Sequence, residues 1–524
     1  MRRSLPLAVL LATAIAFALS IGGCARQRRE PNVLLIVVDT LRADHVGPQG
    51  DLPSLTPNLD AFAAECVVFD HAQSPRAKTT PSVATLLSGL YPHDHGVRDL
   101  TTPLAADVPV LAEGLAAGGY RTAAIVGNYV LQDQLSGLAR GFDLWVEDLP
   151  DEGGVPPHDV PLRGATSLTD GVLCALDLGA TSADGAGPAR SFVRPGKPWF
   201  LYAHYMDPHG AYEPPEPHRA AAIARAGSEI ERVPPALPGA EPPQWVADYN
   251  VPAEARLSDG GIDATRVRAL YAGEVSHVDA QLGRLLDTLR AAGTLENTVV
   301  VVTSDHGESL GEHDYWFEHG RHAYEATCRV PLMIRFPDSM SERPEPGLRT
   351  GDIALADIVP TLTELLRLPR LRGGGRTLGP VRGRSRAGLV MVGEALDEPV
   401  FCEKVERAEK ARAVQAKAVR LGDWKLIRRY THVATPGSNG AEDERQLIVL
   451  AEELYELSSD PQEANDLSED PPADAPLEAL SRELLRFSTA DRHFAELARM
   501  LQQKREELGR EDPEILRALR ALGY

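Results

Sequence analysis

The sequence predicts an α/β fold: a doubly wound, mainly parallel sheet followed by a smaller C-terminal α+β part. Two continuous apolar runs rich in β-branched residues, 33–38 and 299–303, are typical of strands buried on both faces. Segments with helical spacing of apolar residues alternate with such runs, which favours a parallel sheet. Asp39 directly follows the first run and Asp305 closely follows the second. Ligands of such sheets bind at the carboxyl ends of the strands.

The other predicted elements follow in chain order. Apolar, β-branched runs predict strands at 121–126, 199–203 and 330–335, and strand-like sequence begins at 400 and includes 418–429. Helical spacing predicts helices at 57–64, at 84–90 with Pro81 near the first turn, and at 271–292. The segments 145–196 and 212–259 are rich in Pro, Gly and Ala and aperiodic, so we expect long surface insertions there. Residues 372–386 form a basic, Gly-rich loop, and 476–523 are charged and helical.

The composition is that of a folded, acidic protein. Of its 524 residues, 43% are hydrophobic and 25% are charged, so the chain can bury a large core. The formal net charge of −21 repels nucleic acid, and no run of Lys and Arg offsets it, so we expect no nucleic-acid partner. The cysteines beyond position 24 are Cys66, Cys174, Cys328 and Cys402. They are scattered and form no CxxC motif, so the sequence predicts neither a disulfide framework nor a zinc site made of cysteines.

The first residues have the pattern of an export signal. Two arginines precede an apolar run at 5–21, which is followed by two glycines and Cys24. This pattern resembles a bacterial lipoprotein signal, in which Cys24 is acylated and becomes the mature N-terminus. An uncleaved membrane anchor, for which the run is at the lower length limit, and a cytosolic helix are the alternatives. The resemblance implies a lipid-anchored protein that faces outward from the bacterial cell envelope. Because Ala25 follows the cysteine, the outer membrane is favoured over the inner one.

Polar side chains at two strand ends predict a metal site. Asp39 and Thr40 follow the first core strand, and Asp305 and His306 follow a later one. Oxygen and nitrogen donors from separate strand ends can converge on one metal ion. A helix-capping role is the alternative for Asp39. That alternative is weaker for Asp305 and His306, because a cluster of histidines and carboxylates follows them at once.

A helix that opens near Thr79 predicts a nucleophile beside an anion site. The sequence Thr79-Thr80-Pro81-Ser82 opens this helix, and the backbone N–H groups of a first helical turn bind anions. A hydroxyl that lies there and faces a metal is a candidate nucleophile, because the metal lowers its pKa. A simple capping role for the threonine is the alternative.

A histidine-bearing turn follows the strand that begins at Trp199. The turn reads Asp207-Pro208-His209. His209 can hold an anionic substrate or protonate a leaving oxygen. A structural turn histidine is the alternative.

Together these motifs resemble the sulfatase family within the alkaline-phosphatase superfamily. The resemblance runs from about residue 32 to 467 and keeps the order and spacing of the family's motifs. It implies the alkaline-phosphatase/sulfatase type of fold. The acidic strand end matches 38–45, C-x-P-S-R with L-L-T-G-x-Y-P matches 79–92, and D-P-H matches 206–209. Further along, T-S-D-H-G-E with G-E-H matches 303–313, Y-E-x-x-x-R-V-P matches 324–331, and L-Y-D-L-x-x-D-P-x-E-x-x-N-L matches 454–467.

The chain departs from the family where the nucleophile stands. A sulfatase has Cys or Ser at the place of Thr79 and Arg at the place of Val83. The formylglycine aldehyde of sulfatases is made by oxidising an unbranched Cβ, and Thr cannot yield it because its Cβ carries a methyl. Arg76 is no substitute for the missing arginine, because its spacing to the helix is wrong. Thr40 stands where sulfatases usually have a second Asp.

With these departures, the residue set resembles the site of superfamily phosphotransferases that use a Thr nucleophile and a single metal. That resemblance implies one divalent metal held by Asp39, Thr79, Asp305 and His306, and we count Thr40 among the metal-site residues. Zinc or manganese suits such an oxygen and nitrogen donor set, and calcium suits an all-oxygen one. By resemblance, His209 and His319 hold the anion or assist the leaving group. Lys78 is expected to supply the positive charge that Val83 does not.

Three functions are open at this point. The first is a phosphoester hydrolase or transferase that acts through phospho-Thr79. The second is a sulfatase that cleaves sulfate esters with an unmodified Thr, and the third is a non-catalytic protein that binds an anionic glycan or lipid. The partners expected are a small-molecule, glycan or lipid ester and a membrane reached through the lipid anchor.

We divide the chain accordingly. The predicted parts are a signal peptide over 1–23, a tether over 24–31, a sulfatase-like catalytic domain over 32–370, a C-terminal subdomain over 371–470 and a helical tail over 471–524.

Overall fold

The computed structural model describes residues 30–47, 55–149, 163–179, 191–234, 245–369, 382–393, 398–405, 414–435 and 444–491. The predicted signal peptide, the acylated Cys24, the boundary near 370 and the tail beyond 491 lie outside these residues. Within the described part of the chain, no helix is both long and apolar enough to cross a membrane.

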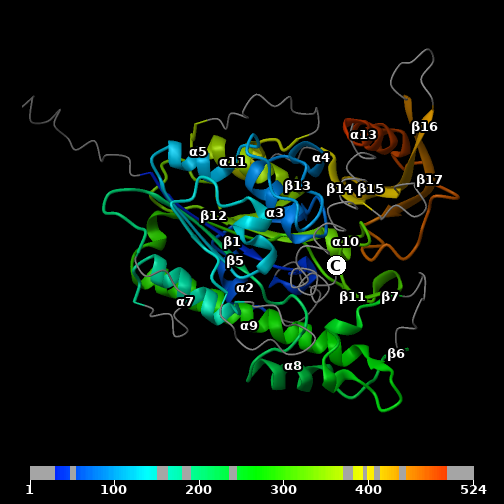
Figure 1. Ribbon diagram of the computed structural model, residues 1–524, viewed down its shortest axis with the longest axis horizontal. Coiled ribbons are helices and arrows are strands. Elements are labelled where there is room, and N and C mark those ends of the chain that lie inside the picture. The colour runs from blue at the N-terminus through cyan, green and yellow to red at the C-terminus, as the bar shows by residue number, and fades with distance from the viewer. Residues whose placement is uncertain are drawn as a thin grey trace, which may run out of the picture.

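An eight-stranded sheet forms the centre of the molecule (Figure 1). β1 (Asn32–Val38) lies between β9 (Thr298–Ser304) and β5 (Trp199–Tyr205) and is parallel to both. β3 (Arg121–Val126) and β4 (Leu144–Val146) continue the parallel set beyond β5. On the other side, β12 (Arg329–Arg335) is antiparallel, followed by β2 (Val67–Gln73) and β13 (Gly347–Ala354). The prediction of a doubly wound, mainly parallel sheet is confirmed.

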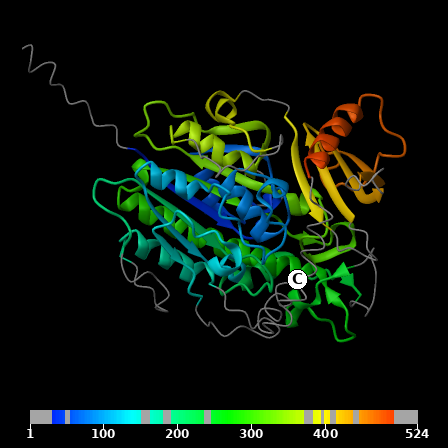
Figure 2. The same cartoon turned by 45° about the horizontal axis from the view of Figure 1, so that its top comes forward.

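Helices cover both faces of this sheet (Figure 2). Alternate residues of β1 point to opposite faces, so Leu34 and Ile36 enter one apolar cluster and Val33 and Leu35 the other. One face is covered by α2 (Pro57–Ala63), α7 (Ala165–Ala175) and the long α9 (Ala264–Ala291). The other is covered by α3 (Thr79–Ser88), α5 (Leu111–Ala117), α11 (Ile358–Leu365) and α12 (Ala387–Val392).

A second, antiparallel sheet forms the C-terminal part. Its strands are β14 (Val400–Val405), β15 (Val414–Leu421), β16 (Trp424–Thr435) and β17 (Glu444–Glu456), in chain order. The amphipathic helix α13 (Leu477–Ala490) packs Leu480, Leu484 and Phe487 into the apolar cluster of this sheet. That cluster also contains Tyr91, Ala354 and Ala356 of the main body, so one apolar layer joins the two parts.

The expectation of aperiodic surface insertions at 145–196 and 212–259 is wrong in part. The first segment contains α7, whose Leu168 and Val172 are buried in the core, and the second contains α8 (His218–Ala226). α7 is short, and its flanks are rich in Pro and Gly, so its period is weak in the sequence. The predicted helices at 84–90 and 271–292 also begin earlier, at Thr79 and Ala264.

Candidate active site

Polar side chains from four parallel strands lie at one edge of the central sheet. Asp39 follows β1, Asp305 and His306 follow β9, Asn128 lies just beyond β3, and His204 lies on β5. All five residues are buried. The carboxyl ends of parallel strands meet at the same edge, which explains why residues so distant in sequence come together.

Four of the predicted site residues meet at this edge. The Thr79 hydroxyl lies 3.5 Å from Asp39 Oδ2 and 3.5 Å from His306 Nε2. His306 Nε2 in turn lies 3.7 Å from Asp39 Oδ1 and 3.5 Å from Asp305 Oδ2. The convergence that the sequence predicted is therefore present in the fold. The metal-binding role of these residues stays a prediction.

Thr40 is fixed through its backbone rather than its side chain. The residue adopts the left-handed region, with φ 54°. Its carbonyl accepts a hydrogen bond of 2.8 Å from the Tyr271 hydroxyl of α9, which also accepts one from the Arg42 backbone N–H. The Thr40 hydroxyl is buried and has no hydrogen-bond partner among the described residues.

The donor atoms of the cluster fit a divalent cation. Asp39 Oδ1, Asp305 Oδ2 and both ring nitrogens of His204 are buried, and none has a hydrogen-bond partner in the described part of the chain. Burial, and next the charge of Asp305, raise the pKa of Asp39 well above its usual range. Burial would also raise the pKa of Asp305, but His306 and His204 lower it to about 2. Each carboxylate thus keeps one buried oxygen without a hydrogen bond, and a cation between the two oxygens would stabilise both.

The helix that carries Thr79 is tied to the residue that follows β9. Thr79 is the first residue of α3 and is buried. The hydroxyls of Ser74, just upstream, and of Ser82, in the first turn, each donate a 2.6 Å hydrogen bond to the Asp305 carbonyl. These two bonds fix the Thr79 segment against the residue that follows β9.

Two further histidines lie beside this cluster. The ring of His319 is centred 4.4 Å from that of His306 and 5.1 Å from that of His209. His319 Nδ1 lies 3.2 Å from Glu308 Oε1, and His209 Nδ1 lies 2.9 Å from the Gly210 carbonyl. Burial lowers the pKa of His209 to about 3, with the His319 charge contributing, and lowers that of His319 well below its usual range. Both rings are therefore neutral at pH 7, with Nδ1 as the hydrogen-bond donor.

Lys78 lies close to His319, whereas Val83 lies in the core. The Lys78 side chain packs against Gly320, the residue after His319: a Cβ added to Gly320 would lie 3.0 Å from Lys78 Cε. Burial lowers the pKa of Lys78 to about 8, and the Lys78 charge is one of the causes that lower the pKa of His319. Val83 is fully buried in the apolar cluster under α3. The position at which sulfatases have an arginine is thus occupied here by a valine that packs in the core.

Sequence reasoning missed three residues of this site: Asn128, His204 and Glu308 as the partner of His319. Asn128 Nδ2 donates a 2.7 Å hydrogen bond to Asp39 Oδ2. His204 Nε2 lies 3.9 Å from Asp305 Oδ2. The available signal for His204 was a single imidazole in the otherwise uncharged strand WFLYAHY.

Other polar groups of the cluster after Asp305 have structural roles. His313 stacks on Tyr324 at 3.5 Å between ring centroids, and His322 stacks on the same tyrosine. Glu312 Oε1 accepts a 2.8 Å hydrogen bond from Arg42. Of the four histidines that the sequence placed here, only His306 and His319 reach the site.

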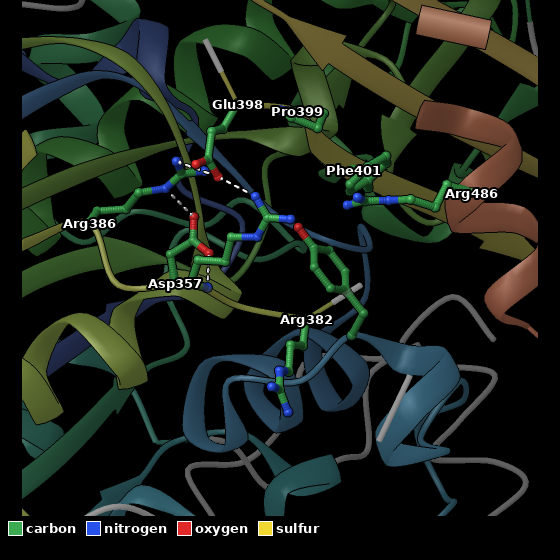
Figure 3. Close-up of a pocket in the computed structure, with 9 residues that line it drawn as sticks. Asp357, Arg382, Arg386, Glu398, Pro399, Phe401 and Arg486 are labelled. Atoms are coloured by element: carbon green, nitrogen blue, oxygen red, sulfur yellow. Dashed lines mark hydrogen bonds and ion pairs between the residues drawn. The ribbon is translucent and has the colours of Figure 1, made fainter. Parts of the chain in front are cut away.

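A small pocket rich in arginines lies away from these residues (Figure 3). Tyr91, just beyond the C-terminal end of α3, lies on its wall. Arg386 pairs with Asp357 at 2.9 Å and with Glu398 at 3.1 Å, and Arg384 pairs with Glu398 at 2.8 Å. These ion pairs join the turn before α11 and the segment before α12 to Glu398, just before β14, so the pocket belongs to the junction of the two parts.

With this geometry in place, comparison with known proteins decides the family. A model of the sulfatase family, described as "Sulfatase", matches residues 31–368. The chain belongs to the sulfatase family. It is a sulfatase-family hydrolase of ester bonds, and the family generally binds a divalent metal.

The similar proteins include a protein named as a sulfatase and one named for the alkaline phosphatase superfamily. The chain is 26% identical to the choline-sulfatase of Rhizobium meliloti, over 84% of this chain and 83% of that protein. It is also 26% identical to the multifunctional alkaline phosphatase superfamily protein PehA of Trinickia caryophylli, over 88% and 96%.

Two solved structures share the fold. One, solved in complex with its substrate D-glucosamine-2-N,6-O-disulfate, has a TM-score of 0.64 and 20% identity, and the match covers 88% of this chain and 98% of that one. The other, the phosphonate monoester hydrolase of Agrobacterium radiobacter, has a TM-score of 0.61 and 22% identity, covering 88% and 96%.

Proposed function

We propose that this sulfatase-family protein is a metal-dependent phosphoester hydrolase or transferase that works through a covalent Thr79 intermediate. The observation that carries the proposal is the position of the Thr79 hydroxyl, 3.5 Å from Asp39 and 3.5 Å from His306, at the start of α3. Asp39, Asp305, His306 and Thr79 would hold the cation. When bound, it supplies positive charge that lowers the pKa of the hydroxyl and stabilises the transition state.

The nature of Thr79 favours phosphorus over sulfur. A formylglycine hydrate expels sulfate by elimination through its second hydroxyl, and an unmodified threonine has no such hydroxyl. A Thr sulfate would therefore have no comparable exit. A phospho-Thr can be attacked by water at phosphorus, which regenerates the threonine and completes hydrolysis; an acceptor alcohol in place of water gives transfer.

The residues around Thr79 account for the protons and the charge. Thr79 loses one proton as its oxygen bonds to phosphorus, and the leaving oxygen gains one. His209 and His319 are neutral and use Nδ1 as donor, so Nε2 of either ring can take up a proton and deliver it to the leaving oxygen. Lys78 and the N–H groups of the first turn of α3 offer positive charge to the transferring group.

A sulfuric ester hydrolase is the second candidate. It is favoured by the names of several relatives, such as the choline-sulfatase and the N-acetylglucosamine-6-O-sulfatase of Bacteroides thetaiotaomicron, the latter 25% identical over 86% of this chain and 85% of that protein. The non-catalytic alternative has less support, because the carboxylates, imidazoles and Thr79 all converge.

The substrate and the location are part of the proposal. We expect a small-molecule or glycan ester, or a lipid ester, because similar proteins include one solved with a sulfated glucosamine and one solved with a neocarrahexaose. We expect the protein at the outward side of the bacterial envelope, because its first residues resemble a lipoprotein signal that ends at Cys24.

The deciding experiment compares matched aryl phosphate, aryl phosphonate and aryl sulfate esters. The protein is stripped with a chelator and reloaded with zinc, manganese or calcium before each assay. We expect turnover of phosphorus esters and a phosphorylated Thr79 peptide after acid quenching. Turnover of the sulfate alone, with no phosphopeptide, would overturn the proposal in favour of the second candidate.

A further inference from the structure

We infer that His204 of β5 is a ligand of the active-site cation, together with Asp39 and Asp305. The inference rests on the metal site of the proposed function and extends it to a residue that no sequence motif marks. It makes the donor set richer in nitrogen than the motifs alone suggest.

The fold aims His204 at the site. Its backbone lies in register with Val37 of β1 on one side and Val126 of β3 on the other, so the strand is held from both sides. Alternation along β5 places its side chain on the face of Tyr202, which belongs to the apolar cluster under α3, and away from Ala203 and Tyr205. That is the face that α3 covers with Thr79.

The imidazole of His204 is buried without the partners that a structural histidine has. Its exposed fraction is 0%, and neither ring nitrogen has a hydrogen-bond partner among the described residues. By contrast, His95, also buried, uses Nε2 with the Thr85 hydroxyl at 2.9 Å and Nδ1 with the Val97 N–H at 3.0 Å. A buried imidazole with no hydrogen-bond partner weakens the folded state, and a cation bound to one of its nitrogens would offset that cost.

The distances favour direct coordination over a supporting role. A histidine that supports a carboxylate ligand donates a hydrogen bond to it, at about 2.7–2.9 Å. His204 Nε2 lies 3.9 Å from Asp305 Oδ2, which is too long for that bond. One donor atom from each of Asp39, His204 and Asp305 lies within 4.8 Å of the others, and the described residues contain no other such group of three His, Cys, Asp or Glu.

His306 lies beside the carboxylate pair and near Thr79. Its Nε2 is 3.5 Å from the Thr79 hydroxyl and 3.5 Å from Asp305 Oδ2. Its Nδ1 lies 2.9 Å from the Gly307 carbonyl, which leaves Nε2 as an acceptor for a cation. His306 Nε2, at 3.5 Å, and His204 Nε2, at 3.9 Å, thus both lie near Asp305 Oδ2. We expect the two imidazoles and the two carboxylates to bind one cation, with the Thr79 hydroxyl as a further oxygen donor.

This donor set selects the metal. Calcium and magnesium prefer oxygen ligands, whereas imidazole favours zinc and the neighbouring late transition metals. With two imidazoles, we expect the site to bind zinc and to discriminate strongly against calcium. A sulfatase-type site built only of oxygen donors would have the opposite preference.

The test counts the imidazoles bound to zinc by X-ray absorption fine structure. Full-length protein is stripped and reloaded with one equivalent of zinc, as wild type, as His204→Gln and as His277→Gln. His277 is a matched control, because it is another largely buried histidine but lies on α9 with Thr166 as its neighbour. We expect two imidazoles in wild type and in the control and one in His204→Gln, with at least a tenfold weaker zinc affinity in that variant.

One imidazole in wild type, unchanged in His204→Gln, would overturn the inference. Two imidazoles in both wild type and His204→Gln would overturn it as well, because the second imidazole would then come from another histidine. A wild-type count of one decides against the inference even if the variant fails to fold. Phosphoester turnover is measured on the same samples. A zinc ion bound by two imidazoles in a protein without that turnover would keep this inference and reject the proposed function.

Discussion

Arg76 faces Glu403 of the C-terminal sheet, with 3.9 Å between Nη1 and Oε1, although it lies three residues before Thr79. The Glu403 N–H also donates a 2.8 Å hydrogen bond to the Pro75 carbonyl. Arg76 is therefore committed to the junction with the second sheet and does not replace the arginine that sulfatases carry at the place of Val83. Through these same two contacts, the C-terminal sheet packs against the segment that leads to Thr79.

Replacement of Thr79 tests the covalent mechanism. Thr79→Ala should reduce kcat for a phosphorus ester by roughly three orders of magnitude or more, because the nucleophile is lost. Fold and zinc affinity should remain largely in place. Thr79→Ser should keep measurable activity, since it loses only a methyl. Full activity of the Ala variant, measured with the metal content checked, would exclude Thr79 as the nucleophile.

Removal of the metal should lower the stability of the folded protein. Without a cation, the buried carboxylates of Asp39 and Asp305 repel each other. A chelator should therefore lower Tm, and zinc at a hundred times its Kd should return about 2.7 kcal/mol. The measurement is a thermal melt against zinc concentration, with an Asp39→Asn, Asp305→Asn double variant as control. An equal response to zinc in that variant would place the binding elsewhere.

The buried carboxylate at the end of α13 should be important for stability. Asp491 Oδ2 lies 2.8 Å from Arg98 and 3.0 Å from Lys417, and both partner side chains are buried. Asp491→Asn leaves two cations with less compensation, so the free energy of unfolding should fall by about 3 kcal/mol in urea denaturation. The matched control is Asp287→Asn, whose carboxylate is 77% exposed and which should change stability by less than about 0.5 kcal/mol.

One lysine shared by two buried glutamates predicts a pH dependence. Lys425 Nζ lies 2.8 Å from Glu325 and 2.7 Å from Glu463. Burial raises the pKa of Glu463 to about 7 from an ordinary 4.5, although Lys425 opposes the rise. The raised pKa contributes stability that is full below about pH 4.5 and is lost as the pH rises through 7.

Glu463→Gln should remove this slope. Unfolding free energies of wild type and variant, measured from pH 4.5 to 8, should differ most in their change across that range. The variant should lose less stability toward pH 8. Parallel curves would mean that Glu463 does not hold a proton in the folded protein.

Cys24→Ser tests the envelope assignment. An acylated Cys24 anchors the protein by its lipid, so the variant should be recovered unprocessed or released from the membrane fraction. Membrane recovery after cell fractionation, with an immunoblot for the processed size, gives the answer. Unchanged recovery and processing would count against lipidation.

The sequence could predict the parts of the site that stand next to strong local signals. Asp39 and Asp305 end apolar runs whose strand character is unambiguous, and Thr79 precedes a proline in a first helical turn. Because the carboxyl ends of parallel strands lie at one edge of the sheet, residues at these positions are expected to lie close together.

The parts that could not be predicted depend on tertiary register. His204 is a single polar residue on β5, and Asn128 lies just beyond the neighbouring β3. Their contacts with Asp305 and Asp39 arise only from the pairing of β5 with β1 and of β3 with β5. The ion pair of Arg98 with Asp491 spans 393 positions and joins a loop of the main body to the end of α13, and no local pattern predicts it.

The Asp305 carbonyl accepts hydrogen bonds from the hydroxyls of both Ser74 and Ser82, so the end of β9 and the segment around Thr79 are already joined without a cation. A cation that draws Asp39 and Asp305 together therefore also tightens the backbone on either side of Thr79. Amide hydrogen exchange in 74–82 should slow when zinc is added, and this segment becomes a reporter of metal occupancy that needs no substrate.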